Sequence, residues 1–97
     1  MDIIAKTILR QINTLDPWAL QAYGSKKIKP LQECKEFEGG IEFQVNGLHF
    51  SGKISIQLSW SDEYSIYFID KNEEIEKEIH GVHFPELVEV LDYIEKG

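Results

Sequence analysis

Residues 41–50 read IEFQVNGLHF, and this stretch decides the fold. Its first apolar residues alternate with polar ones, which is the period of a strand with one buried face. The Asn-Gly pair at 46–47 is the favoured sequence for a two-residue type I′ turn, because both turn positions need a positive φ. We therefore predict a hairpin with Val45 opposite Leu48 and all the large apolar side chains on one face.

The alternation continues beyond this hairpin. The polar residues 61–63 form a turn between two further strands, and residues 75–79 fit a final short strand. Tyr67 and Ile69 fall on the opposite face, where they would form an exposed apolar patch if helices cover only one side of the sheet. The meander is expected to have three to four antiparallel strands. Its core-facing residues are expected to be Phe50, Ile54, Ile56, Leu58, Trp60, Tyr64, Ile66 and Phe68.

Helical patterns flank the strands. Residues 2–15 predict an amphipathic helix, since Ile4, Ile8, Ile12 and Leu15 share one stripe. Asp16-Pro17 has the form of a helix start and Gly24 that of a helix end, with Trp18 between them as a lid on the core. Residues 85–96 predict a last helix that buries one apolar side. Its other side carries Glu86, Glu89 and Asp92.

Residues 25–40 have the least regular pattern. Pro30 is incompatible with a central strand, so only an edge strand near 28–32 fits. Gly39-Gly40 is expected to end this segment as a flexible turn. The chain, 1–97, is therefore predicted to be a single α+β domain. It would comprise an N-terminal helix, a short second helix, the meander and a C-terminal helix packed on the sheet.

Composition narrows the classes of function. The formal net charge of the 97 residues is −7, and residues 61–97 hold eleven acids against three bases. This balance disfavours direct nucleic-acid binding. Apolar runs stay far below the roughly 20 residues of a membrane-spanning helix, and the first residues lack the pattern of a signal peptide. We therefore expect no membrane contact. Because a lone Cys34 allows no internal disulfide, we also expect a cytoplasmic protein.

The residues that could carry chemistry are few. His80 and His83 have the spacing H-x-x-H, but zinc needs three or four ligands and the remaining candidates lie in other predicted elements. Cys34 lies among acidic residues, which disfavour a reactive thiolate. The sequence contains neither a nucleophile elbow nor a phosphate-binding loop. We therefore expect no catalytic residue, no metal and no cofactor.

Several segments in order resemble a group of small, mostly uncharacterised proteins of bacteriophages, prophages and other mobile elements. They are IAKTILRQI at 4–12, AYGSKK at 22–27, GIEF at 40–43, IQL at 56–58, DEYSIYF at 62–68 and GVHF at 81–84. These motifs are structural. The resemblance implies an intracellular accessory protein, and it transfers no catalytic or binding residue to this chain.

Three hypotheses follow. The first is a non-enzymatic interaction module that binds a protein partner, or itself, through the second face of the sheet. The second is an acidic decoy that imitates nucleic acid and blocks a host defence or transcription protein. The third is a small-ligand binder or enzyme. For the first two, the candidate interaction residues are Trp60, Tyr64, Tyr67, Ile69, Glu86, Glu89 and Asp92.

Overall fold

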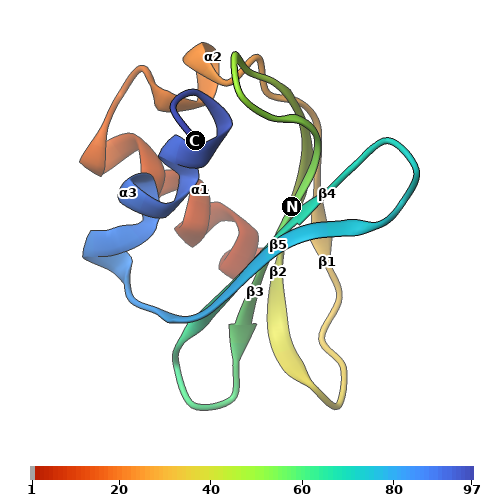
Figure 1. Cartoon of the computed structure of the whole chain (residues 1–97). Coiled ribbons are helices and arrows are strands. Elements are labelled where there is room, and N and C mark those ends of the chain that lie inside the picture. The colour runs from red at the N-terminus through yellow and green to blue at the C-terminus, as the bar shows by residue number, and fades with distance from the viewer. Residues whose placement is uncertain (1) are drawn as a thin grey trace.

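A five-stranded antiparallel sheet in the order β1-β2-β3-β4-β5 carries the helices of this chain (Figure 1). The computed structural model describes residues 2–97. The predicted α+β class is confirmed, although the sheet has five strands where three to four were expected. The elements are α1 (Ile3–Leu15), α2 (Ala19–Ala22), β1 (Lys26–Leu31), β2 (Phe37–Asn46), β3 (Ser51–Ser59), β4 (Tyr64–Ile69), β5 (Ile75–Val82), the 3₁₀ turn η1 (Phe84–Glu86), α3 (Leu87–Leu91) and the 3₁₀ turn η2 (Asp92–Ile94).

The additional strand is β1, at one edge of the sheet. It covers the segment where the sequence allowed an edge strand, and Pro30 pairs with Ile41 of β2. An edge strand tolerates proline because only one of its sides must supply hydrogen bonds. The ladder is interrupted between Lys26 and Lys29, where Lys27 has a φ of 55°. This bulge and the proline together limit the regular part of β1 to a few residues.

The hairpin between β2 and β3 differs from the prediction in its register. Val45 pairs with Gly52 instead of facing Leu48, and residues 47–50 form a four-residue loop. The carbonyl oxygen of Ile94 accepts hydrogen bonds from the amides of His49 and Phe50, both at 3.0 Å. The C-terminal turn therefore holds the loop open, and Leu48 is 92% exposed.

The two glycines at 39–40 are also placed differently from the prediction. They belong to the interior of β2 and form no turn. A β carbon on Gly40 would overlap the carbonyl oxygen of Ile56 in β3. The residue is glycine because the neighbouring strand approaches too closely for a side chain, a common reason for glycine inside a strand.

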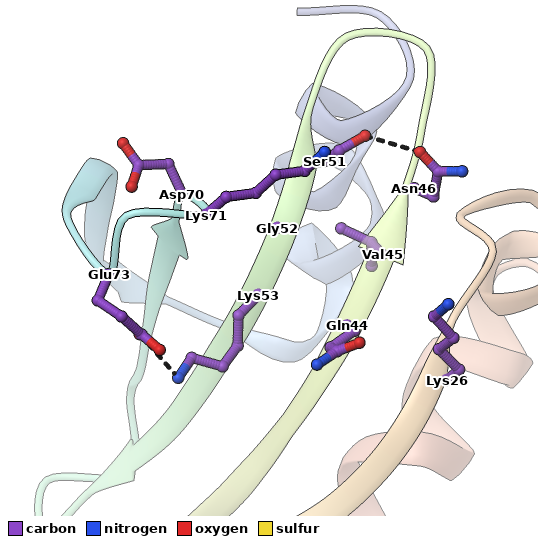
Figure 2. Close-up of a pocket in the computed structure, with 10 residues that line it drawn as sticks. All are labelled: Lys26, Gln44, Val45, Asn46, Ser51, Gly52, Lys53, Asp70, Lys71 and Glu73. Carbon is purple, nitrogen blue, oxygen red and sulfur yellow. Dashed lines mark hydrogen bonds and ion pairs between the residues drawn. The ribbon is translucent and has the colours of Figure 1, made fainter.

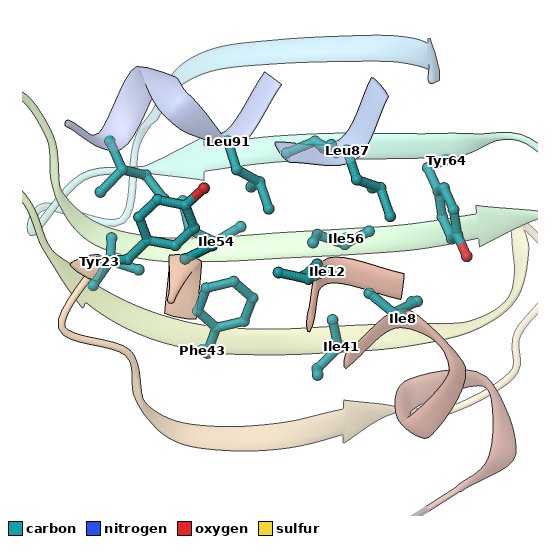
Figure 3. Close-up of a cluster of buried hydrophobic side chains, with 14 of the residues drawn as sticks. Ile8, Ile12, Tyr23, Ile41, Phe43, Ile54, Ile56, Tyr64, Leu87 and Leu91 are labelled. Atoms are coloured by element: carbon teal, nitrogen blue, oxygen red, sulfur yellow. The ribbon is translucent and has the colours of Figure 1, made fainter. Parts of the chain in front are cut away.

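One hydrophobic core fills the space between the helices and one face of the sheet (Figure 3). α1 begins at Asp2, whose carboxylate accepts from the amides of Ile4 and Ala5. The predicted last helix is broken into η1, α3 and η2, but its apolar side is buried as expected. The buried side chains include Ile8, Ile12, Tyr23, Ile41, Phe43, Phe50, Ile54, Ile56, Ile66, Phe68, Leu87, Leu91 and Ile94.

Two tryptophans expected in the core lie outside it. Trp18 is 70% exposed, because α2 has only four residues and Ala19 and Tyr23 fill the available core positions. Trp60 is 56% exposed, because β3 ends at Ser59 and the indole lies in the turn beyond it. Among residues 2–97, no helix combines the length and apolar composition needed to span a membrane.

The contact between the loop and the C-terminal turn gives a first prediction. A β carbon on Gly47 would overlap the carbonyl oxygen and the side chain of Ile94. Gly47→Ala should therefore lower the free energy of unfolding by about 2 kcal/mol, the usual scale of overpacking. Leu48→Ala is the matched control in the same loop and should change it by less than about 0.5 kcal/mol. Urea unfolding measures both, and equal effects of the two variants would contradict the described register.

Candidate functional site

The face of the sheet that points away from the helices is the first candidate surface. α1 and α3 lie on the same side of the sheet, and in the part of the chain that the structure describes no helix covers the other side (Figure 1). Residues from all five strands form a row across the middle of this open face. In strand order they are Lys29, Glu42, Ser55, Tyr67 and Glu78.

Ion pairs make much of the open face polar. Lys29 Nζ lies 3.2 Å from the Glu42 carboxylate. Lys53 Nζ lies 3.2 Å from Glu73 and 4.0 Å from Glu42. These partly exposed pairs add little stability, but they fix the positions of the charges on this face. The expected apolar patch is therefore small, and its residues are only partly exposed.

Tyr67 lies in a cluster at the β4–β5 side of this face. Its ring meets the ring of His80 edge to face, with centroids 5.7 Å apart. His80 Nδ1 lies 2.9 Å from Ser65 Oγ, and His80 Nε2 lies 3.5 Å from Glu78. The neighbours of Tyr67 on this face, Ser55 and Ser65, are much smaller than the tyrosine. The cluster presents an aromatic ring with polar groups around it, which suits contact with another protein.

The two histidines of the H-x-x-H spacing have different surroundings. His80 is on the open face, whereas His83 precedes η1 and lies 3.7 Å from Glu63 and from Glu86. Within the described residues, no three histidine, cysteine or carboxylate side chains are grouped so that they could hold a metal ion. Cys34 is exposed, and its thiol lies 3.3 Å from the Glu36 carboxylate.

Trp60 and Tyr64 occupy opposite environments on either side of the β3–β4 turn. The Trp60 indole donates to the carbonyls of Cys34 and Lys35, at 3.3 and 3.1 Å, and so joins this turn to the β1–β2 loop. Tyr64 is 6% exposed and its hydroxyl donates to Gln11 of α1 at 2.6 Å. Burial raises the pKa of Tyr64 above its ordinary value. Tyr64 is therefore a core residue, which argues against its predicted use as an interaction residue.

The three predicted acids line a hollow of about 390 Å³ between β5 and α3. Glu86 also accepts from the backbone amide of His83 at 3.1 Å. Asp92 lies 3.7 Å from Lys96. Ile79, Val90 and Tyr93 also line the hollow, as do Lys77 and Lys96. The acids are thus brought together on one flank, although not on the open face.

A second hollow, of about 450 Å³, was not indicated by the sequence (Figure 2). It lies at the end of the open face next to the β4–β5 turn, where Figure 2 shows Lys53 of β3 directed toward Glu73. Lys26 of β1 and Lys71 of the turn also line it. Its lysines come from three segments far apart in the chain, so only the strand order could have predicted their proximity.

Comparison with protein-family models, curated proteins and solved structures finds no match for this chain. The surfaces of the chain are therefore what indicate its function. The open face offers Tyr67 with charged side chains around it, and the β5–α3 flank offers three carboxylates with two lysines and apolar side chains. Both arrangements are suited to binding other macromolecules through polar and aromatic contacts.

Removing the hydroxyl group from each of the two buried tyrosines should change the free energy of unfolding in opposite directions. The Tyr23 hydroxyl is buried without a hydrogen-bond partner among the described residues, so Tyr23→Phe should raise the free energy of unfolding by about 1 kcal/mol. Tyr64→Phe removes the bond to Gln11 and should lower it by about 1 kcal/mol. Urea unfolding at neutral pH measures both. A stability loss in Tyr23→Phe would show that this hydroxyl is bonded after all.

Tyr23 also predicts how the free energy of unfolding depends on pH in the alkaline range. Burial, and then the carboxylates of Asp92, Asp16 and Glu95, raise the pKa of Tyr23. A raised pKa in the folded chain means that stability is intact below the unfolded value of about 10 and falls as pH rises above it. Unfolding free energies measured between neutral and strongly alkaline pH should show this fall, and Tyr23→Phe should make it shallower. An unchanged slope in the variant would contradict this assignment.

Proposed function

We propose that this protein is a non-enzymatic interaction module that binds a protein partner through the open face of its sheet. The observation that carries the proposal is the placement of α1, α2 and α3 against one face, which leaves the partly exposed Tyr67 on the other face without a helix over it, although Ser55 beside it is buried. Large uncovered faces of antiparallel sheets are common, but a central aromatic ring flanked by fixed charges is typical of protein interfaces.

The small residues around Tyr67 support this proposal. Ser55 lies directly opposite the tyrosine, and Ser65 is its neighbour on the same face of β4. The Tyr67 ring is partly exposed beside them, and the His80 ring packs against it. Tyr67 combines an apolar ring with a hydroxyl, a pairing that makes tyrosine a frequent anchor of interfaces. Ile69 adds a partly exposed apolar side chain on the same strand face.

The resemblance to small phage and mobile-element proteins remains a prediction. Under that prediction the partner is a bacterial host protein, and the module acts in the cytoplasm without direct contact to nucleic acid or membrane. The open-face proposal does not depend on this origin. It depends only on the position of Tyr67 and its neighbours.

One observation favours a second candidate function, an acidic decoy that imitates nucleic acid. Glu86, Glu89 and Asp92 line one hollow together with Lys77 and Lys96, and Glu76 lies beside it, bonded to Tyr93. Binding of this kind would be largely electrostatic, so it should weaken steeply with added salt and compete with DNA. Binding through the Tyr67 face should depend on salt much less.

A capture experiment tests the open-face proposal. The immobilised chain is exposed to a bacterial lysate, and the retained proteins are quantified by mass spectrometry. Tyr67→Ala should reduce the retained partner by at least about tenfold, as expected for an aromatic anchor. Trp18→Ala is the matched control, because it removes an exposed aromatic side chain outside the sheet and should leave retention unchanged.

Two results would contradict the open-face proposal. One is equal retention by the wild type and Tyr67→Ala. The other is retention that survives Tyr67→Ala but is lost with Glu86→Gln/Glu89→Gln, which would support the acidic decoy. Circular dichroism of each variant checks that the fold is intact, since Tyr67 is only partly buried.

A further inference from the structure

The two edge strands of the sheet have no backbone partner on their outer sides. β1 pairs only with β2 and β5 only with β4. Within residues 2–97, the backbone groups of 26–31 and 75–82 make no hydrogen bonds beyond those two ladders. Unpaired edges of this kind can receive a strand from another chain unless charge or shape prevents it.

The two edges carry opposite charges. β1 presents Lys26, Lys27 and Lys29, all exposed. The β5 edge presents exposed acids at three positions, Glu74 immediately before the strand and then Glu76 and Glu78. Lys26 and Lys27 form no ion pair with any described residue, so their charges are available to another molecule. In a chain whose net charge is −7, this basic edge is the exception.

Charge favours one combination of edges. Residues directly opposite each other in an extended sheet share a face. An antiparallel pair of β5 strands centred on Glu78 places the two copies of Glu78 together, whereas a pair centred on Ile79 places Glu78 opposite His80. Two β1 strands would bring lysines together. β1 against β5 brings the lysines of one edge to the acids of the other, so this combination has the most favourable charges.

We propose that this protein associates with further copies of itself head to tail, with β1 of one copy against β5 of the next. A contact between two different surfaces does not close on itself in a dimer, so it adds copies in a row. Pro30 and the bulge at Lys27 keep the shared backbone ladder short. The association is therefore weak and reversible. It uses the edges of the sheet, and so goes beyond the partner binding proposed for the Tyr67 face.

Edge-neutralised variants test the head-to-tail arrangement. Lys26→Gln/Lys29→Gln removes two of the three charges of the basic edge, and Glu74→Gln/Glu78→Gln removes two of the three charges of the acidic edge. Sedimentation from micromolar to millimolar concentration should show dimers and larger species for the wild type, and monomers for each variant alone. An equimolar mixture of the two variants retains one intact pair of edges. It should form a one-to-one dimer and nothing larger.

Matched controls separate the edges from total charge and from the open face. Glu33→Gln/Glu36→Gln changes the net charge by the same amount as the acidic-edge variant. Its two substituted residues lie in the β1–β2 loop, so this variant should associate like the wild type. Tyr67→Ala should also associate like the wild type, so failure of this inference and failure of the open-face proposal can be told apart. A variant that exchanges the charges, with Lys26→Glu/Lys29→Glu and Glu74→Lys/Glu78→Lys, should regain association.

Three results would overturn the proposal. One is a wild type that stays monomeric to millimolar concentration, which would mean that the edge charges keep copies apart. Another is a variant mixture that remains monomeric. The third is a wild-type dimer that never grows, because a closed dimer requires a symmetric contact.

Discussion

The burial of alternate side chains on one face of the sheet is the constraint on which the structure depends. Ile41 and Phe43 of β2 and Ile54 and Ile56 of β3 are nearly inaccessible to solvent beneath the helices. Each such side chain contributes roughly 2 kcal/mol when removed from water, so no other register of the central strands can compete. The carbonyl of Ile94 completes the arrangement by binding the loop at 47–50. The open face and the two free edges are consequences of this one-sided core.

Much of the fold could be predicted from local patterns, and the errors have a common physical cause. Period-two alternation placed Ile54 and Ile56 in the core and Tyr67 on the other face, because side-chain direction in a strand is a local property. The turn at 46–47 was mispredicted because Ile94, far along the chain, binds the loop and changes the register. Position 40 is glycine because another strand approaches it closely, and a local pattern of two glycines predicts a turn instead. Local sequence contains neither kind of contact.

The candidate surfaces were less predictable than the core. The alternation that made Tyr64 core-facing already argued against its use as an interaction residue, and the structure places it in the core. Whether a helix covers the Tyr67 face is a question of tertiary packing, so the sequence left it open. The opposite charges of β1 and β5 gain meaning only from the strand order, which puts them at opposite edges of one sheet. The acids at the C-terminal end were visible in the composition, but their hollow against β5 was not.

Nuclear magnetic resonance of the methyl groups and aromatic rings tests the one-sided core most directly. The account predicts nuclear Overhauser contacts from the helices, at Ile8, Ile12 and Leu91, to the buried strand residues. It predicts none from any helix to the Tyr67 ring, whose signals should broaden with a water-borne paramagnetic probe. Contacts between a helix and Tyr67, or a Tyr67 ring protected from the probe in the monomer, would contradict the account.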